Sequence, residues 1–114
     1  MKDCLFCKIV KKDIPAEKIF EDEHIIAFND INPQAPIHIL LIPKEHYASL
    51  NDIPEEKNAV LGHLLLKARQ IAREKGIGER GYRIVLNTAK ESGQDVFHIH
   101  FHLLGGRQMH WPPG

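Results

Sequence analysis

Apolar and polar residues alternate with a period of two between Val96 and Leu104. Such alternation is typical of a strand with one buried face. The apolar members, Phe97, Ile99, Phe101 and Leu103, are expected to face a core. The polar members, His98, His100 and His102, are expected to line one exposed groove. Strand surfaces favour β-branched and aromatic residues. Three imidazoles in a row, each able to exchange a proton near neutral pH, therefore indicate a catalytic or metal site.

The rest of the pattern predicts a small α+β domain built on an antiparallel sheet. A short helix is expected over residues 4–11, where the dipeptide Ile14-Pro15 then ends the helical run. A capping-box-like sequence at Asp52–Glu55 predicts the start of a long helix with one apolar face, and Gly76 predicts its end. Five strands are expected, over residues 18–21, 24–28, 37–42, 81–87 and 96–104.

Composition narrows the classes of partner. The chain has 114 residues, 43% of them hydrophobic and 26% charged, with a formal net charge of zero. These values are ordinary for a soluble globular protein, and the charge balance argues against a nucleic-acid polymer or a membrane as partner. No apolar run is long enough to span a membrane and the first residues do not resemble a signal peptide, so we expect a cytoplasmic protein.

The run His98-Ile99-His100-Phe101-His102-Leu103-Leu104 resembles the signature of the histidine-triad (HIT) superfamily. Residues 30–38, 42–46, 93–94 and 105–114 are similar to its Hint branch, the histidine-triad nucleotide-binding proteins, so the resemblance covers almost the whole chain. It implies one HIT domain over residues 1–114, in a homodimer whose two sheets form one continuous sheet. It also implies a hydrolase that cleaves the P–N bond of purine nucleoside 5′-phosphoramidates.

The resemblance assigns roles to four histidines. His100 would be the nucleophile that forms a nucleotidyl-histidine, and His102 would protonate the departing amine. His98 and His38 would orient the ring of His100. By its position in an apolar strand alone, His38 reads first as a hydrogen-bonded core residue, and only the resemblance favours the site role. No cofactor is expected to take part in the chemistry.

The resemblance also predicts nucleotide contacts. Asp30 would accept hydrogen bonds from the ribose hydroxyls, although it could instead cap the turn before Asn32. Asn87 and Gln94 would contact phosphate or leaving group, with loop hydrogen bonding as the alternative for each. Trp111, in a tail (residues 105–114) expected at the dimer interface, would cover the partner's active site or pack on its own protomer. The base slot would be lined by residues that are also good core residues: Leu5, Phe6, Ile9, Phe28, Ile31 and Leu40.

Two features depart from the well-known animal members of this branch. Asp95 replaces a serine whose hydroxyl meets the phosphate, and an ionised carboxylate there would repel that anion. The pair Cys4-x-x-Cys7 resembles bacterial members and the uridylyltransferase branch, in which two cysteines and two histidines hold zinc. The matching histidines here are His46 and His98, a donor set that suits tetrahedral Zn²⁺. Two reduced, idle thiols are the alternative.

Two other functions stay open at this level. One is hydrolysis of dinucleoside polyphosphates, the activity of a sister branch that lacks the Trp-Pro-Pro-Gly ending at residues 111–114. The other is a nucleotide-binding regulatory or scaffold module whose slow catalysis is incidental. An intact triad is compatible with each.

Overall fold

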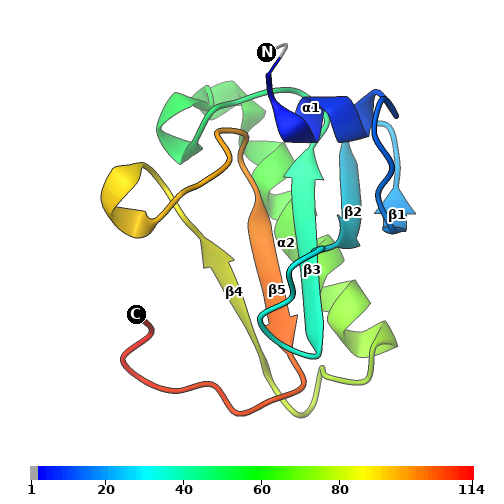
Figure 1. The fold of residues 1–114 in the computed structure, drawn as a ribbon, viewed down its shortest axis with the longest axis vertical. Coiled ribbons are helices and arrows are strands. Elements are labelled where there is room, and N and C mark those ends of the chain that lie inside the picture. The colour runs from blue at the N-terminus through cyan, green and yellow to red at the C-terminus, as the bar shows by residue number, and fades with distance from the viewer. Residues whose placement is uncertain (1–2) are drawn as a thin grey trace.

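The computed structural model describes residues 3–114 and confirms the predicted α+β architecture (Figure 1). One five-stranded sheet runs in the order β1-β2-β3-β5-β4, and all neighbouring strands are antiparallel. No helix in this part of the chain combines the length and the apolar character that a membrane crossing requires. The helices and strands are α1 (Leu5–Val10), β1 (Lys18–Glu21), β2 (Ile25–Asn29), β3 (Ile37–Pro43), α2 (Asn58–Glu74), β4 (Tyr82–Leu86) and β5 (Phe101–Gly105).

The long helix α2 covers one face of the sheet, behind the strands in Figure 1. Its residues Leu64, Ala68 and Ile71 are almost completely buried against that face. Alternate residues of the central strands meet them because successive strand side chains point to opposite faces. Apolar burial of this kind is the main source of folding free energy. The strand members of this core are Ile25, Ala27, Ile39, Leu41, Phe101 and Leu103.

The short helix α1 covers only the upper part of the other face (Figure 1). Phe6 and Ile9 on α1 pack against the strand residues of opposite parity, which are Ile26, Phe28, Leu40 and Ile42. Because α1 has six residues, the lower part of this face has no helix over it. The register pairs Leu40 with His102 and His38 with Leu104, so β3 and β5 carry these two histidines on the α1 side of the sheet.

The predicted strand over residues 96–104 is wrong in its first half, because β5 begins only at Phe101. Ile99 N–H donates to the carbonyl of Tyr47, in the loop after β3, at 2.8 Å and not to a strand neighbour. The exposed histidine groove is also wrong in part: His98 and His100 are 0% and 2% exposed. Phe97, expected in the core, is 55% exposed. The alternation therefore describes only the residues from Phe101 onward, which form β5.

The start of the long helix also differs from its prediction. Two 3₁₀ turns, Leu50–Asp52 and Glu55–Lys57, precede α2, which begins at Asn58 without a side-chain cap. Asp52 is not the cap, since its carboxylate accepts the hydroxyl of Ser49 at 2.8 Å. The predicted end is confirmed: Gly76 has φ +77° just beyond the helix, a conformation that glycine adopts without strain.

Candidate active site and metal centre

The imidazole of His100 is held in one tautomer by the backbone. Its Nδ1 lies 2.8 Å from the carbonyl oxygen of His98, and a carbonyl can only accept a hydrogen bond. Nδ1 therefore carries the proton, and Nε2 of the neutral ring keeps its lone pair. The ring of Phe6 packs edge-on against this imidazole, with ring centres 5.0 Å apart. A neutral imidazole held in this way can use Nε2 as a nucleophile.

Below His100, three side chains form a hydrogen-bond chain. The backbone N–H of Gln34 donates to His38 Nδ1 at 3.0 Å, so the proton of neutral His38 is on Nε2. That Nε2 lies 2.9 Å from His102 Nδ1 and 3.3 Å from a carboxylate oxygen of Asp30. Burial lowers the pKa of His38, which keeps the ring neutral near pH 7 although the Asp30 carboxylate opposes the shift.

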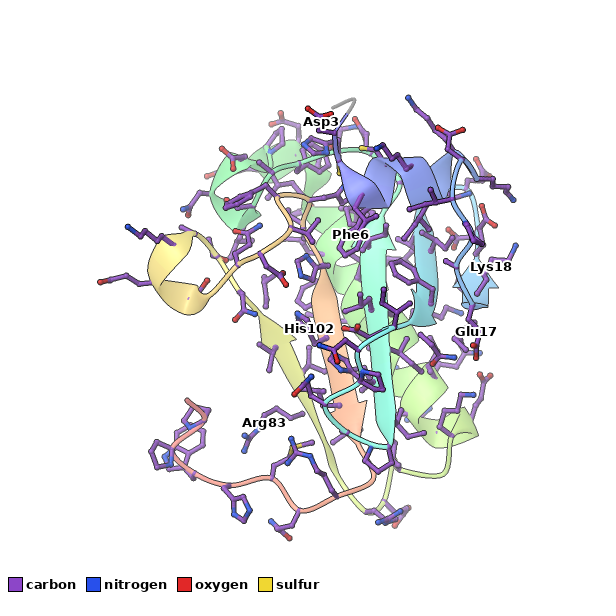
Figure 2. All side chains as sticks on the ribbon, viewed as in Figure 1. Asp3, Phe6, Glu17, Lys18, Arg83 and His102 are labelled. Carbon is purple, nitrogen blue, oxygen red and sulfur yellow. The ribbon has the colours of Figure 1, made fainter. Side chains whose placement is uncertain are left out.

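This hydrogen-bond chain ends at His102 Nε2, a polar atom that has no hydrogen-bond partner in the described part of the protein. Because His102 Nδ1 accepts from His38, its Nε2 carries the proton. Burial, together with the neighbouring His100 and His38 rings, lowers the pKa of His102 to about 4, so the ring is neutral at pH 7. Within residues 3–114, His102 Nε2 and the Tyr47 hydroxyl are the buried side-chain polar atoms that have no hydrogen-bond partner. An unpaired buried donor costs about 1–3 kcal/mol. A ligand acceptor beside His102 would remove this cost. Figure 2 shows His102 on the open part of the sheet, below Phe6.

Above His100, four ligand-type side chains converge between α1 and the loop after β3. Their donor atoms, from Cys4, Cys7, His46 and His98, all lie within 4.8 Å of one another. Cys4 is the N-cap of α1, where its sulfur accepts the Cys7 N–H at 3.3 Å, so the helix start itself brings both sulfurs together. Burial and the neighbouring Cys4 sulfur raise the pKa of the Cys7 thiol.

The histidines of this cluster fit a metal. His98 Nε2 lies 2.7 Å from the Pro43 carbonyl, so Nε2 carries the proton and the Nδ1 lone pair points at the sulfurs. His98 Nδ1 is 3.4 Å from Cys4 Sγ and 3.2 Å from His46 Nδ1. Burial lowers the pKa of His98 to about 4, so protonation at neutral pH does not compete for that lone pair. Two thiolates and two neutral imidazoles, one oriented by a carbonyl, are the donor set of a tetrahedral Zn²⁺ site.

The predicted base-slot residues fall into two groups. Phe6, Ile9, Phe28 and Leu40 are buried together between α1 and the sheet, and the Phe6 and Phe28 ring centres are 5.6 Å apart. Leu5 and Ile31 are instead 44% and 96% exposed, so they do not belong to this cluster. Contact of any of the six with a base stays a prediction.

Two side chains that were predicted to contact the ligand, Gln94 and Asp30, already form hydrogen bonds within the protein. The Gln94 side-chain oxygen accepts from Ala89 N–H at 2.8 Å, and its nitrogen donates to the Ala48 carbonyl at 2.8 Å. Asp30 Oδ1 accepts from Asn32 N–H at 2.8 Å. Both geometries match the loop and turn alternatives, while contacts with ligand stay predictions. Asn87 follows the end of β4 and is half-buried.

Asp95 and Trp111 lie at the edges of the site. Asp95 Oδ1 is 3.9 Å from His100 Nε2, and its side chain is 84% exposed. Trp111 is 81% exposed in the tail that passes the β4 side of the sheet, and its ring centre lies 6.0 Å from Arg83 Cζ on β4. Its position relative to a partner's site stays a prediction.

Several site groups could not be found from the sequence. The Pro43 carbonyl and the Gln34 N–H each fix a histidine tautomer, and both are backbone atoms. Every non-proline residue offers the same N–H and every residue the same carbonyl, so no sequence signal marks them. Only the path of the chain in space distinguishes these two.

Residues 11–109 match the HIT domain family. Among curated relatives, the chain is 50% identical over 113 residues to an uncharacterized HIT-like protein of Synechocystis sp., covering 99% of this chain and 98% of that protein. It is 51% identical over 112 residues to the 14 kDa zinc-binding protein of Zea mays, covering 96% of this chain and 87% of that one.

Solved structures agree with this assignment. A HIT family hydrolase from Legionella pneumophila superposes with a TM-score of 0.96 at 53% identity, over 98% of this chain and 100% of that chain. A histidine triad nucleotide-binding protein from Candida albicans (TM-score 0.83, 34% identity) covers 96% and 83% of the two chains. A Zn-bound histidine triad family protein from Mycobacterium smegmatis (0.81, 40%) covers 93% and 76%. With this fold, these identities and the triad geometry, the chain belongs to the HIT domain family.

Proposed function

We propose that this protein hydrolyses the P–N bond of purine nucleoside 5′-phosphoramidates through a covalent intermediate on His100. The observation that carries the proposal is the hydrogen bond from His100 Nδ1–H to the His98 carbonyl, which leaves the Nε2 lone pair free to attack. The HIT family hydrolase and the histidine triad nucleotide-binding protein among the similar structures support the reaction class and the ligand class.

The first step needs a nucleophile and an acid. The lone pair of His100 Nε2 forms a bond to phosphorus, and the P–N bond to the amine breaks. The amine receives its proton from His102 Nε2–H, the donor that the His38 contact orients and that has no partner in the protein. As His102 Nε2 gives up this proton, its Nδ1 takes the proton of His38 Nε2–H, 2.9 Å away, and His38 Nε2 regains a proton from solvent, so both rings stay neutral. The Asp30 carboxylate, 3.3 Å from His38 Nε2, accepts from the reprotonated ring.

The second step is hydrolysis of the nucleotidyl-histidine. Water attacks phosphorus and gives one proton to His102 Nε2, which lost its own in the first step; the P–N bond to His100 breaks, and the nucleoside monophosphate leaves. Imidazole is a suitable leaving group here because the His98 carbonyl stabilises its Nδ1–H throughout. Within this proposal the buried aromatic pair of Phe6 and Phe28 offers an apolar wall for the base.

We also propose that Cys4, Cys7, His46 and His98 hold a structural zinc ion. The zinc would supply cross-linking and no chemistry at phosphorus. By fixing His98, whose carbonyl orients the nucleophile, these four ligands would tie α1 to the active site. The zinc-binding relative from maize and the Zn-bound mycobacterial structure support this part.

A homodimer with one continuous sheet completes the proposal. β4 ends the strand order, so one of its edges has no strand neighbour within the described chain. An unpaired edge is a template for strand addition. The tail with Trp111 passes the same side of the sheet, near Arg83. Sedimentation equilibrium tests this: a mass of twice the 13.0 kDa chain is expected, and a monomer at micromolar concentration contradicts it.

The activity is tested with wild type and His100→Ala on two substrates, an adenosine 5′-phosphoramidate and a diadenosine polyphosphate. We expect wild type to turn over the phosphoramidate and the variant to lose at least about three orders of magnitude, as for removal of other nucleophiles. Equal rates for the two proteins would overturn the enzyme proposal. A wild-type preference for the polyphosphate would assign the chain to that hydrolase activity, and binding without turnover to a regulatory module.

The zinc proposal has its own test. Purified wild type and Cys4→Ser are dialysed against a weak chelator and their metal content is measured. About one zinc per wild-type chain is expected, with much less in the variant, because loss of one thiolate leaves three ligands. Wild type without bound zinc would contradict the site.

A further inference from the structure

A cavity near the active site has Asp95 in its wall, and the Asp95 carboxylate in turn approaches His100. The cavity has a volume of about 410 Å³ and lies between the start of α1 and the segment that precedes β5. Small-molecule sites are commonly clefts of about this size or larger. The lining residues are Asp3, Cys4, Leu5, His46, Asp95, Val96 and Phe97.

Asp95 places a carboxylate in the wall of the cavity, on the path to His100. Asp95 Oδ1 lies 3.9 Å from His100 Nε2, and 84% of the Asp95 side chain is exposed. Between Asp3 and Gly114, no lysine or arginine pairs with it. A phosphate that reached His100 would bring a second negative charge close to this carboxylate, and like charges at such separations repel even through water. A cation supplied by the substrate would offset that repulsion.

The remaining walls of the cavity are partly apolar. Phe97 and Leu5 are 55% and 44% exposed, so both offer apolar surface to a molecule in the cavity. Val96 lies between Asp95 and Phe97 along the chain and is half-buried. An alkyl chain a few carbons long would cover these side chains, and burying their apolar surface would be favourable.

We infer that this cavity receives the leaving group and that Asp95 selects amines whose alkyl chain carries a second, positively charged group. The inference rests on the proposed function, because it concerns the amine released when the P–N bond breaks. The second cation takes no part in bond making. The departing nitrogen still takes its proton from His102, while the distal ammonium stays charged and lies beside the Asp95 carboxylate.

Three adenosine 5′-phosphoramidates of similar chain length test the inference. Their amines are 1,4-diaminobutane, pentylamine and 4-aminobutanoate, which carry a distal positive, neutral and negative group. For wild type, kcat/KM is expected to fall in that order, by about fivefold at each step, the size typical of an exposed ion pair. The differences should shrink as salt rises, because salt screens exposed charges.

Variants of Asp95 separate charge selection from the intrinsic reactivity of the amines. Asp95→Asn should bring the diaminobutane-to-pentylamine ratio close to that of the uncatalysed chemistry, Asp95→Glu should keep the wild-type ratio, and Asp95→Lys should favour 4-aminobutanoate. Glu91→Gln is the matched control, since it removes one negative charge from an exposed residue in the same loop outside the cavity. It should behave as wild type.

The outcomes separate the two proposals. Equal ratios in wild type and Asp95→Asn, with turnover that still depends on His100, would overturn the selection by Asp95 and leave the phosphoramidase in place. Failure of wild type to cleave any of the three compounds would overturn both. A changed ratio in Glu91→Gln equal to that in Asp95→Asn would show a long-range charge effect and overturn the local assignment.

Discussion

Two polar clusters flank His100, and both contain two histidines with acidic or sulfur partners. The upper cluster joins Cys4, Cys7, His46 and His98, while the lower one joins Asp30, His38 and His102. In each, the candidate donor atoms lie within 4.8 Å of one another. By residue type and distance alone, either could be read as a metal site.

The backbone distinguishes the two clusters. In the upper one, His98 Nε2–H donates to the Pro43 carbonyl, which turns the Nδ1 lone pair toward the other ligands. In the lower one, the Gln34 N–H occupies the His38 Nδ1 lone pair, so Nε2 keeps its proton and points that proton at His102. A nitrogen that carries a proton cannot bind a metal. A backbone acceptor therefore favours metal binding, and a backbone donor favours proton transfer.

The largest expected difference concerns metal content. Cys7→Ser should reduce bound zinc from about one ion per chain to below about a tenth, whereas His38→Gln should leave it unchanged, because only the upper cluster offers converging lone pairs. Elemental analysis after dialysis measures both variants in parallel. Two zinc ions per wild-type chain, or zinc loss in His38→Gln, would contradict this difference between the two clusters.

The next effect is on catalysis by the lower cluster. His102→Ala should lower kcat/KM for an alkylamine phosphoramidate by about 10²–10⁴, the usual contribution of a general acid. For a phosphoramidate of an aromatic amine that departs without protonation, the loss should be much smaller. Steady-state rates for the two substrates give the ratio. A uniform loss for both would indicate that His102 positions the substrate and does not donate the proton.

A smaller effect should follow from removing the backbone donor. Gln34→Pro deletes the N–H that holds His38 in its tautomer and should reduce kcat about tenfold, within the range for groups that orient an active residue. Gln34→Ala keeps the N–H and serves as the control. Circular dichroism and zinc content confirm that each variant folds. Equal kcat for the two variants would mean that the backbone does not set the tautomer.

The smallest effect concerns an ion pair between a histidine and an aspartate, outside both clusters. His63 Nε2 lies 2.7 Å from Asp22 Oδ2, and the side chains are 38% and 31% exposed. Burial raises the pKa of Asp22, but the hydrogen bonds from His63 and from the His24 and Ile25 N–H groups outweigh it and lower the pKa to about 2. A carboxyl with a lowered pKa stabilises the fold above its unfolded pKa of about 4.

Asp22→Asn should therefore lower the free energy of unfolding at pH 6 by less than about 1 kcal/mol, because solvent screens this pair. The difference from wild type should disappear as the pH falls from about 4 to about 2, where Asp22 becomes protonated in the wild type. Urea unfolding at several pH values measures it. A difference that persists at pH 2 would assign the effect to the turn geometry and not to the charge.

The helical and strand elements were largely predictable because each depends on local pattern. The apolar stripe of α2 and the run from Ile37 to Ile42 had the right periods, and both elements are observed. The boundaries near Asp52 and Val96 were wrong. There, a serine hydroxyl and the Tyr47 carbonyl compete for groups that the regular elements would otherwise use. Such partners are distant in sequence or specific to one turn, and periodicity does not encode them.

The sequence by itself determined which residues could react: three alternating histidines, two cysteines at helical spacing and an acid at position 95. Only the tertiary structure decided what each does. It buried His98 and His100, tied Gln94 to the Ala48 and Ala89 backbone, and set the Asp95 carboxylate 3.9 Å from His100 Nε2. The physical reason is that reactivity is a property of the side chain, whereas protonation, burial and orientation depend on atoms that folding brings together from distant parts of the chain.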